Sequence, residues 1–578
     1  MAKIVKLQCS LSCKIEFLLK KLSSTDKDDT LSLLFDYGAS IYDQETNSFS
    51  IEPNDFSVVI TDLLKFFKKR KIKVQIDERT AKIIEQINQF NQSPKSKQKV
   101  NTKLSLNFKR EITQLQKRNV KRLLQYKHGA SFSVPGAGKT TEALAFLDAQ
   151  KNKYLTLIIC PKNAFGSWEE QLKQCLWKYS SQRLVGSDAS VLKEAKKPYG
   201  YLFITYSKFS NISEKLLSVL SEKPFNLILD ESHKIKRGED GKWGREVLKI
   251  APLAESRIIL SGTPLPNSED DLVPQIKFLF PHLKTIPNPG KFIKTYYVRT
   301  TKKELKLPKL ECKLVNVPLS KNQKKLYGII KSRLLRDKIG INNLKDRETL
   351  RKINKCYIQI LQVISNPLLL IKAGIDFDDK GIFDLFEEGP KISYACIKAR
   401  QLAAKGQKVI IWSYFKENID LIASHLRDLN AVLIYGDTNV GDEGEEDTRE
   451  YRINKFKNDK SCSVLVANPA ACGESISLHQ NCHFAIYVDR TYNAAHYLQS
   501  QDRIHRFGLS KNTKTVVEIL YAKNTIDDSI NRRLNLKTRR MAEILSDSSL
   551  HVEPEDDDDI LISNEKDAQD FISTLRKE

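Results

Sequence analysis

The sequence has no grouping of cysteines that is typical of a zinc site or a disulfide framework. Its 578 residues include 10 cysteines, and these are scattered along the chain. Cys9 with Cys13, and Cys472 with Cys482, are near neighbours, but neither pair has the C-x-x-C spacing that tetrahedral zinc sites use. We therefore expect no structural metal and no disulfides.

Long apolar stretches are missing as well. The first residues, MAKIVKLQCSL, include no apolar run long enough for a signal peptide, and no segment approaches the roughly 20 apolar residues of a membrane span. We therefore expect no membrane partner and a cytoplasmic location, which would be on the nucleoid in a bacterium and in the nucleus in a eukaryote.

Acidic residues are too few to balance the basic ones. The chain has 95 Lys and Arg against 71 Asp and Glu, which leaves a net charge of +24. An excess of this size favours a polyanionic partner such as nucleic acid. A lysine-rich proteome from an AT-rich genome would give the same excess, so charge alone does not decide between the two explanations.

Two sets of short apolar runs predict two parallel β-sheets. Apolar runs without polar alternation are typical of parallel strands that helices cover on both faces. The first set is YLTLIIC, YLFITY, NLILDE and RIILSGTP, and the second is KVIIWS, AVLIYGD, SVLVAN, FAIYVD and TVVEILY. We therefore predict an α/β fold with two doubly wound lobes and a mainly helical, basic segment between them.

Smaller regions flank the two lobes. The stretch NQSPKSKQKVNTK has the composition of a linker, and the like-charged block EPEDDDD near the end is typical of a flexible tail. In the expected order, an accessory domain occupies 1–90, a linker 91–105, the first lobe 106–290, a helical insertion with the inter-lobe linker 291–390, the second lobe 391–545 and the acidic tail 546–578.

One segment of the accessory domain combines apolar and basic residues. VVITDLLKFFKKRKIK places Leu63, Phe66 and Phe67 at near-helical spacing beside several lysines and Arg70. This pattern predicts an amphipathic helix whose basic face is either solvated or in contact with nucleic acid, and we favour the solvated face.

The stretch SFSVPGAGKTT is close to a phosphate-binding loop but lacks its first glycine. In the pattern G-x-x-x-x-G-K-[ST], that position is Ser133. Gly136 and Gly138 would let backbone N–H groups turn inward around a phosphate. Lys139 would reach the β and γ phosphates, and Thr140 would hold Mg²⁺. Taken alone, the same letters also fit a plain turn between a strand and a helix.

A second stretch, FNLILDESHKIK, ends an apolar run in Asp230 and Glu231. A strand that ends in carboxylates delivers them to the carboxyl edge of its sheet, where ligands bind in open α/β folds. Asp230 can coordinate Mg²⁺ through water, and Glu231 can orient or deprotonate an attacking water. A solvated strand end is the alternative, which the P-loop about 90 residues upstream makes a poor explanation.

A third stretch, YLQSQDRIHRFG, spaces Gln499, Arg503 and Arg506 at i, i+4 and i+7. On a helix these three side chains would share one face. Such a face could supply arginine fingers that stabilise the charge developing on a γ-phosphate. A solvated basic face is the alternative.

The order of these and five further segments resembles motifs I to VI of superfamily two helicases. The segments are SVPGAGKTT, LIICPKNAFGSWEEQ, LFITYSKFS, LILDESHKIK, ILSGTPLPNS, KVIIWSYF, LVANPAACGESISL and QSQDRIHRFG. The stretch YYVRTTKKELKLPKLECKLVNVPLSKNQKKLY between the halves is similar to the segment that marks the Swi/Snf branch of DNA translocases. The resemblance covers about residues 106–535 and implies two RecA-like lobes. In that branch the first P-loop position is often not glycine, so Ser133 is compatible with an intact loop.

The resemblance also implies roles for individual residues. The catalytic set would be Lys139, Asp230, Glu231, Gln499, Arg503 and Arg506, and ATP would be bound by Gln116, Pro135, Gly136, Ala137, Gly138, Lys139, Thr140 and Thr141. Thr140 and Asp230 would hold Mg²⁺. Ser261, Gly262 and Thr263 would couple hydrolysis to movement. DNA contacts would come from Lys162, Thr205, Tyr206, Ser413 and Ser477.

Two motifs depart from the family pattern. Gly508 is followed by Leu509 where glutamine is usual, and Ser475-Ile476-Ser477 replaces the usual Gly-x-Asn. Neither change removes a phosphate ligand, so the departures concern the coupling to movement and the grip on DNA rather than hydrolysis.

The resemblance implies an ATP-dependent motor that moves along double-stranded DNA. One alternative is an ATPase that remodels or displaces a protein on DNA as a subunit of a repair, transcription or antiphage assembly, with partner subunits docked on the N-terminal domain or the acidic tail. Another is a non-catalytic DNA-binding scaffold, against which the intact Lys139, Asp230, Glu231 and Arg506 argue.

Overall fold

The computed structural model describes most of the chain. The described residues are 4–9, 15–18, 22–36, 41–43, 48–51, 63–78, 80–81, 100, 102–150, 152–220, 223–265, 268–281, 283, 285–286, 288–336, 347–372, 380–436, 438, 448–471, 477–492 and 494–547. The acidic block at 553–559, most of the expected linker at 91–105, and Ser475 with Ile476 lie outside them.

Within the described residues, the first lobe is built on a seven-stranded parallel sheet in the order β12-β6-β11-β10-β7-β9-β8. Its strands are β6 (His128–Ser131), β7 (Leu155–Ile159), β8 (Ser181–Arg183), β9 (Tyr201–Ile204), β10 (Phe225–Asp230), β11 (Ser256–Leu260) and β12 (Tyr297–Val298). The central strands are buried along almost their whole length, as both-face coverage requires. We call the described residues 102–300 lobe 1.

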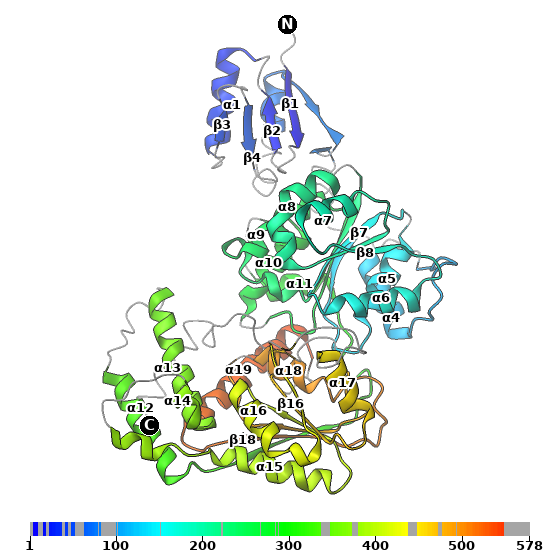
Figure 1. Cartoon of the computed structure of the whole chain (residues 1–578). Coiled ribbons are helices and arrows are strands. Elements are labelled where there is room, and N and C mark those ends of the chain that lie inside the picture. The colour runs from blue at the N-terminus through cyan, green and yellow to red at the C-terminus, as the bar shows by residue number, and fades with distance from the viewer. Residues whose placement is uncertain are drawn as a thin grey trace. The chain divides into compact units, whose positions relative to one another are not determined.

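Helices cover both faces of this sheet. They are α4 (Gln114–Leu124), α5 (Lys139–Ala149), α6 (Ala164–Cys175), α7 (Asp188–Ala195), α8 (Tyr206–Leu220), α9 (Lys242–Ile250), α10 (Leu272–Leu279) and α11 (Pro289–Ile293). Figure 1 shows α4, α5 and α6 on one side and α8, α9 and α10 on the other. The apolar core on the α4–α6 side includes Phe146, Trp168 and Phe203.

The second sheet has six parallel strands within the described residues, in the order β13-β18-β17-β14-β16-β15. The strands are β13 (Leu310–Asn316), β14 (Val409–Trp412), β15 (Val432–Ile434), β16 (Val464–Ala467), β17 (Phe484–Tyr487) and β18 (Thr515–Tyr521). Separate apolar cores fill its two faces, one around Trp412 and Tyr487 and the other around Ile411 and Ile486. We call the described residues 301–547 lobe 2.

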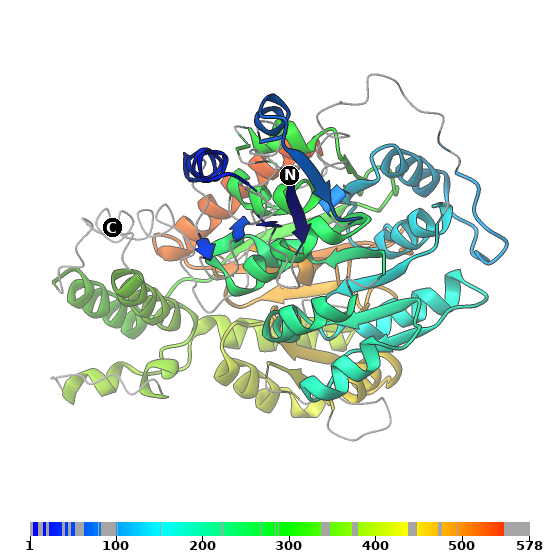
Figure 2. The same ribbon diagram turned by 90° about the horizontal axis from the view of Figure 1, so that it is seen from above.

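The helices of lobe 2 are α12 (Lys321–Arg336), α13 (Arg347–Ser365), α14 (Leu368–Lys372), α15 (Pro390–Ala403), α16 (Lys416–His425), α17 (Arg449–Asn458), α18 (Ala494–Gln501) and α19 (Ile526–Leu545). The helices α12 and α13 lie side by side at the side of the lobe 2 sheet (Figures 1 and 2). They share an apolar cluster with α19 that includes Tyr357 stacked on Tyr492.

Both doubly wound sheets were expected from the sequence, and both are present. The segment 291–390, for which a mainly helical insertion was expected, contains α12, α13 and α14 among its described residues. It also contributes two strands that were not expected, β12 to the first sheet and β13 to the second. The seven residues LECKLVN of β13 form an edge strand in which every residue is partly or fully exposed. Such a strand has no continuous apolar run, so the pattern that predicted the other strands did not detect it.

The N-terminal region forms a third, smaller sheet in the order β3-β4-β2-β1-β5. Its elements are β1 (Ile4–Cys9), β2 (Ile15–Leu18), α1 (Ser24–Asp36), β3 (Ile41–Asp43), β4 (Ser48–Ile51) and β5 (Lys73–Ile76). Residues 63–69 are helical, with Leu63 and Phe67 buried and Lys68 and Lys69 exposed, as the amphipathic pattern predicted. The exposed lysines fit the solvated basic face that the sequence favoured, and a nucleic-acid contact by them stays the alternative.

None of the helices in the described ranges is long and apolar enough to cross a membrane.

Candidate functional site

Three loops with predicted functional residues lie at one edge of the lobe 1 sheet. The P-loop follows β6, Ser261 follows β11, and Asp230 ends β10. The strands β6, β11 and β10 are parallel neighbours in the sheet. Their carboxyl ends therefore meet at the same edge, which is where open α/β folds bind ligands.

The P-loop joins β6 to α5 through two glycines in the left-handed region. Gly136 has φ +83° and Gly138 has φ +87°, conformations that residues with a side chain rarely adopt. Gly138 is also crowded, because an added Cβ would lie 2.3 Å from Gln116 Nε2. Both positions of the motif therefore need glycine for a conformational reason.

Ser133, at the position of the missing glycine, does not need to be glycine. Its φ is not positive, and its hydroxyl accepts a 3.0 Å hydrogen bond from Thr300 N. Its carbonyl oxygen accepts a 2.9 Å hydrogen bond from Lys139 Nζ. The loop thus has the backbone turn and the lysine of an intact P-loop.

Gln116 is fixed in place at the start of α4. It forms a capping box with Thr113, in which Thr113 N donates to Gln116 Oε1 at 3.0 Å and Gln116 N donates to Thr113 Oγ1 at 3.2 Å. Because Oε1 is held by Thr113, the amide nitrogen is the end of the side chain beside Gly138. The residue that the family resemblance assigns to adenine therefore lies next to the P-loop.

The end of β10 is held by Trp168 and carries a strained residue. Trp168 Nε1 donates to Asp230 Oδ2 at 2.9 Å, and Glu231 N donates to Asp230 Oδ1 at 3.0 Å. Glu231 has φ 51° and ψ 55°, in the left-handed region. Strain of this kind in a residue other than glycine is concentrated at functional sites.

A buried histidine connects Glu231 to the loop after β11. His233 Nδ1 lies 3.4 Å from a carboxylate oxygen of Glu231 and 3.3 Å from Ser261 Oγ. Thr263 N donates to the same Ser261 hydroxyl at 3.1 Å. His233 therefore connects Glu231 to Ser261, and the Ser261 hydroxyl in turn connects to Thr263, which are two of the three predicted coupling residues. The sequence motif contains His233, but the sequence alone assigns it no role.

The oxygen donors at this edge suit a magnesium ion held partly by a nucleotide. Thr140 lies in the first turn of α5 and Asp230 ends β10, so a hydroxyl and a carboxylate are available. Mg²⁺ usually takes one or two protein oxygens together with substrate phosphates. Among the described residues no group of three or more His, Cys, Asp or Glu side chains could hold a metal by itself.

Glu142 is a buried acid below the P-loop that sequence reasoning missed. It accepts hydrogen bonds from Asn119 Nδ2 and Ser131 Oγ, both at 2.7 Å. Burial raises the pKa of its carboxyl to about 6, against the lowering effect of these hydrogen bonds. An acidic residue directly before the apolar run ALAFL was the signal that could have identified it.

The third motif in lobe 2 is not a single helical face, which corrects the sequence prediction. Helix α18 ends at Gln501, so Gln499 lies on it, whereas Arg503 and Arg506 lie in the turns that follow. Those turns are fixed by contacts outside the helix, because Leu478 N donates to Arg503 O at 2.9 Å and His505 Nε2 lies 2.7 Å from Pro308 O. The chain therefore does not continue as an α-helix after Gln501.

The five residues predicted to contact DNA fall into two groups, one exposed or partly exposed and the other buried. Lys162 is exposed, and Thr205 and Ser477 are partly exposed. Tyr206 and Ser413 are buried, at 2% and 0% exposure. Tyr206 OH donates to Asp230 O at 2.8 Å, and Ser413 Oγ donates to Asp489 Oδ2 at 2.6 Å. The structure does not support a DNA contact by either of these two side chains.

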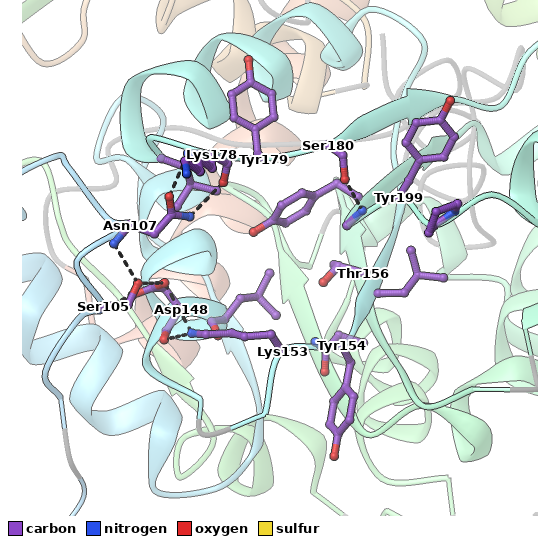
Figure 3. A pocket seen from close by; sticks show the side chains of 17 residues that line it. Ser105, Asn107, Asp148, Lys153, Tyr154, Thr156, Lys178, Tyr179, Ser180 and Tyr199 are labelled. Carbon is purple, nitrogen blue, oxygen red and sulfur yellow. Dashed lines mark hydrogen bonds and ion pairs between the residues drawn. The ribbon is translucent and has the colours of Figure 1, made fainter.

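A cavity of about 500 Å³ lies at the opposite edge of the lobe 1 sheet. It is lined by residues at the amino ends of strands, such as Leu155 of β7 and Tyr201 of β9. Figure 3 shows Ser105 and Lys153 turned to Asp148, with distances of 2.7 Å for the hydroxyl and 3.4 Å for the ion pair. The cavity is thus separate from the P-loop edge.

Two family models match the chain in the regions described above. The SNF2-related domain matches residues 115–288, and the helicase conserved C-terminal domain matches residues 392–508. The first match contains the P-loop and Asp230-Glu231, and the second contains Gln499, Arg503 and Arg506.

Individual proteins are similar at low identity. The chain is 22% identical to Protein CHROMATIN REMODELING 19 of Arabidopsis thaliana, over 75% of this chain and 68% of that protein. It is also 22% identical to ATP-dependent helicase fft3 of Schizosaccharomyces pombe, over 73% of this chain and 55% of that protein. The chain therefore spans only part of the length of these relatives.

The structure of the Sulfolobus solfataricus SWI2/SNF2 ATPase core in complex with dsDNA matches with 20% identity and a TM-score of 0.33, over 77% of this chain and 94% of that one.

Proposed function

Because the chain belongs to the Swi/Snf-type ATPases of helicase superfamily two, we propose that it hydrolyses ATP with Mg²⁺ in order to move along double-stranded DNA. The observation that most supports ATP hydrolysis is the convergence of the P-loop, Asp230-Glu231 and Ser261 at one edge of the lobe 1 sheet. A scaffold subunit would have no need of this set.

In the proposed reaction the lobe 1 residues bind the nucleotide and activate the attacking water. The N–H groups around Gly136 and Gly138, together with the amino end of α5, bind the phosphates. Lys139 leaves the Ser133 carbonyl for the phosphate oxygens. Thr140 and Asp230 would hold Mg²⁺, and the ion would supply positive charge beside the transferred phosphoryl group. Glu231 takes the proton of the attacking water.

Lobe 2 would complete the site during the cycle. We propose that Arg503 and Arg506 reach the γ-phosphate when the lobes close and that Gln499 assists them, as the order of the family motifs implies. His233 would transmit the state of Glu231 to Ser261 and Thr263, since it contacts both Glu231 and the Ser261 hydroxyl.

DNA would be bound mainly through its phosphates. The excess of positive charge, +24 over the chain, favours such a polyanionic partner. The exposed Lys162 and the partly exposed Thr205 and Ser477 remain candidates for this contact. We also propose that the protein acts where cellular DNA is, on the cytoplasmic nucleoid of a bacterium or in the nucleus of a eukaryote.

A second proposal is remodelling of a protein–DNA complex by the same motor. The matched family models begin at residue 115, which leaves the five-stranded N-terminal sheet available for another role. A relative is named as a chromatin remodelling protein. A partner subunit would then dock on the N-terminal sheet or on the acidic tail.

The test is ATP hydrolysis with Mg²⁺, measured without DNA, with duplex DNA and with single strands. We expect turnover that duplex DNA stimulates severalfold, and at least as well as single strands do. Absence of ATP turnover under all three conditions would contradict the proposed hydrolysis. Turnover at the same rate with and without DNA would contradict the proposed movement along DNA.

A further inference from the structure

A cluster of buried polar side chains lies beneath the P-loop. Its members are 0% to 1% exposed and are Asn119, Ser131, Ser133, Glu142 and Thr300. They come from α4, β6, the P-loop, α5 and the residues after β12. Four of them lie within residues 119–142, and Thr300 alone is distant in the sequence. We call this group the Glu142 cluster.

Glu142 and Asn119 form the centre of the cluster. Asn119 Nδ2 donates to Glu142 Oε1 at 2.7 Å and to Thr300 Oγ1 at 2.9 Å. Ser131 Oγ donates to the other carboxylate oxygen of Glu142 at 2.7 Å. Through Asn119, the carboxylate on α5 is therefore connected to the hydroxyl of Thr300.

Ser133 connects the same cluster to the phosphate-binding lysine. Its hydroxyl lies 3.3 Å from Ser131 Oγ and 3.5 Å from Glu142 Oε2, and it accepts from Thr300 N at 3.0 Å. Its carbonyl oxygen accepts from Lys139 Nζ. If Lys139 moved toward a phosphate, it would release the Ser133 carbonyl. The cluster is therefore in contact, through Ser133, with the lysine that would bind the nucleotide.

The P-loop is also paired with the chain that leaves lobe 1. Phe132 N donates to Val298 O at 2.9 Å, and Val134 N donates to Thr300 O at 3.0 Å. Thr300 ends one compact unit of the chain, and the next unit resumes at Thr301. Thr300, which is hydrogen-bonded to Asn119 and Ser133, is thus the last residue before the segment that leads to β13.

Packing alone does not account for a carboxylate at this position. The residues that follow Glu142 in α5, such as Ala143 and Leu144, are apolar and fully buried. An apolar side chain there would avoid the cost of removing a carboxylate from water, which hydrogen bonds only offset. A hydrogen-bonded network does, however, fix the relative positions of the segments that contribute to it.

We propose that the Glu142 cluster is a positioning device that holds Ser133 and Lys139 for the phosphates and transmits the state of the P-loop to Thr300. The inference rests on the proposed ATP-binding function of the P-loop. It assigns a role to Asn119 and Glu142, which belong to none of the quoted sequence motifs, and to Thr300, which lies near the start of the Swi/Snf-like stretch YYVRTT. Thr300 would be the exit point at which a change at the nucleotide reaches the inter-lobe segment.

The test uses Thr300→Val in the full chain, with Thr156→Val as the matched control. Valine keeps the shape and the backbone N–H of Thr300 but removes the hydroxyl that Asn119 contacts. Thr156 is a similarly buried threonine in β7, at the opposite edge of the lobe 1 sheet from the P-loop. We expect Thr300→Val to lower DNA-stimulated kcat about fivefold, the size of one lost hydrogen bond, with nucleotide Kd within about twofold. Thr156→Val should match wild type.

A second pair of variants separates positioning from packing. Glu142→Gln keeps the size of the side chain and one of its two acceptor oxygens, whereas Glu142→Leu keeps neither acceptor, so the glutamine variant should retain several times more kcat than the leucine variant at a similar Tm. Equal kcat in the two variants, or a Thr300→Val protein that matches Thr156→Val, would overturn the inference.

Hydrogen exchange distinguishes this inference from the proposed function, because it needs no turnover. In wild type, nucleotide should slow amide exchange both at 132–139 and at 298–301. In Thr300→Val the slowing at 132–139 should persist and that at 298–301 should disappear. Slowing at both segments in the variant would overturn the inference, whereas a wild-type chain that nucleotide does not affect would contradict ATP binding itself.

Discussion

Glu231 combines the chemistry of a base with a backbone conformation that few residues other than glycine adopt. We expect Glu231→Gln to bind ATP as wild type does but to turn over at least ~100-fold more slowly, because a positioned proton acceptor contributes about that factor. Fluorescent-nucleotide binding and steady-state ATPase assays check the two halves of this prediction. Wild-type turnover in the variant would exclude Glu231 as the base.

Gly138 offers a test of the P-loop conformation. Gly138→Ala would place a Cβ against Gln116 Nε2 at a φ of +87°. The left-handed conformation alone costs about 1–2 kcal/mol, so we expect a loss of roughly tenfold or more in nucleotide affinity.

Gly406→Ala is the matched control for Gly138→Ala. Gly406 also has a positive φ, +66°, but an added Cβ there meets nothing within 4 Å. The Gly406→Ala variant should have a lower Tm than wild type and an unchanged nucleotide affinity. If both variants bind nucleotide equally well, Gly138 is not required for the loop.

For individual residues, the sequence predicted the chemical role of a side chain better than it predicted whether that side chain is exposed. Asp230 and Glu231 lie at a strand end as their motif indicated. Tyr206 and Ser413 were expected on a DNA-facing surface, yet their hydroxyls are buried in hydrogen bonds within their own lobes. A motif gives residue types and spacing, whereas the direction of a side chain depends on neighbours such as Asp489 that come from elsewhere in the chain.

Among the elements, the segment after α18 shows how tertiary contacts override local spacing. The i, i+4, i+7 pattern predicted a continuous helix, but α18 ends at Gln501. The hydrogen bond from Leu478 N to Arg503 O uses a carbonyl that an extended helix would have needed. Periodicity describes a segment in isolation, so it could not include this partner.

We expect Arg506→Ala to lower kcat by roughly 10³ and to leave nucleotide affinity largely intact, as losing an arginine finger does. The reason is that the proposed contact forms only when the lobes close around the phosphates. Steady-state kinetics and nucleotide binding measured on the same protein give the two values. An unchanged kcat would mean that Arg506 has another role.

The strands show which part of the fold the sequence determines locally. Nine apolar runs predicted β7, β9, β10, β11, β14, β15, β16, β17 and β18, and all nine are strands. The edge strand β13 and the short β6, with the sequence HGAS, have no such run. Their place in the sheets depends on pairing with β18 and β11, which are distant in the chain.

For the whole molecule, the two family-model matches and the two parallel sheets agree with the two-lobed ATPase that the motifs implied, whereas movement along DNA stays a proposal. The sequence could not reveal the Glu142 cluster, because Thr300 reaches the members from residues 119–142 only when the chain after β12 packs beside β6 and the P-loop. The role of the N-terminal sheet stays a prediction, since sheets of this size support many functions.

The most direct test of the whole account is displacement of a third strand from a DNA triplex. A motor that moves along duplex DNA should release the third strand in an ATP-dependent reaction, while a plain forked duplex stays largely paired. Glu231→Gln should bind the same DNA and release nothing. If the wild-type protein leaves triplexes intact and unwinds forks efficiently, movement along intact duplex is contradicted and strand separation takes its place.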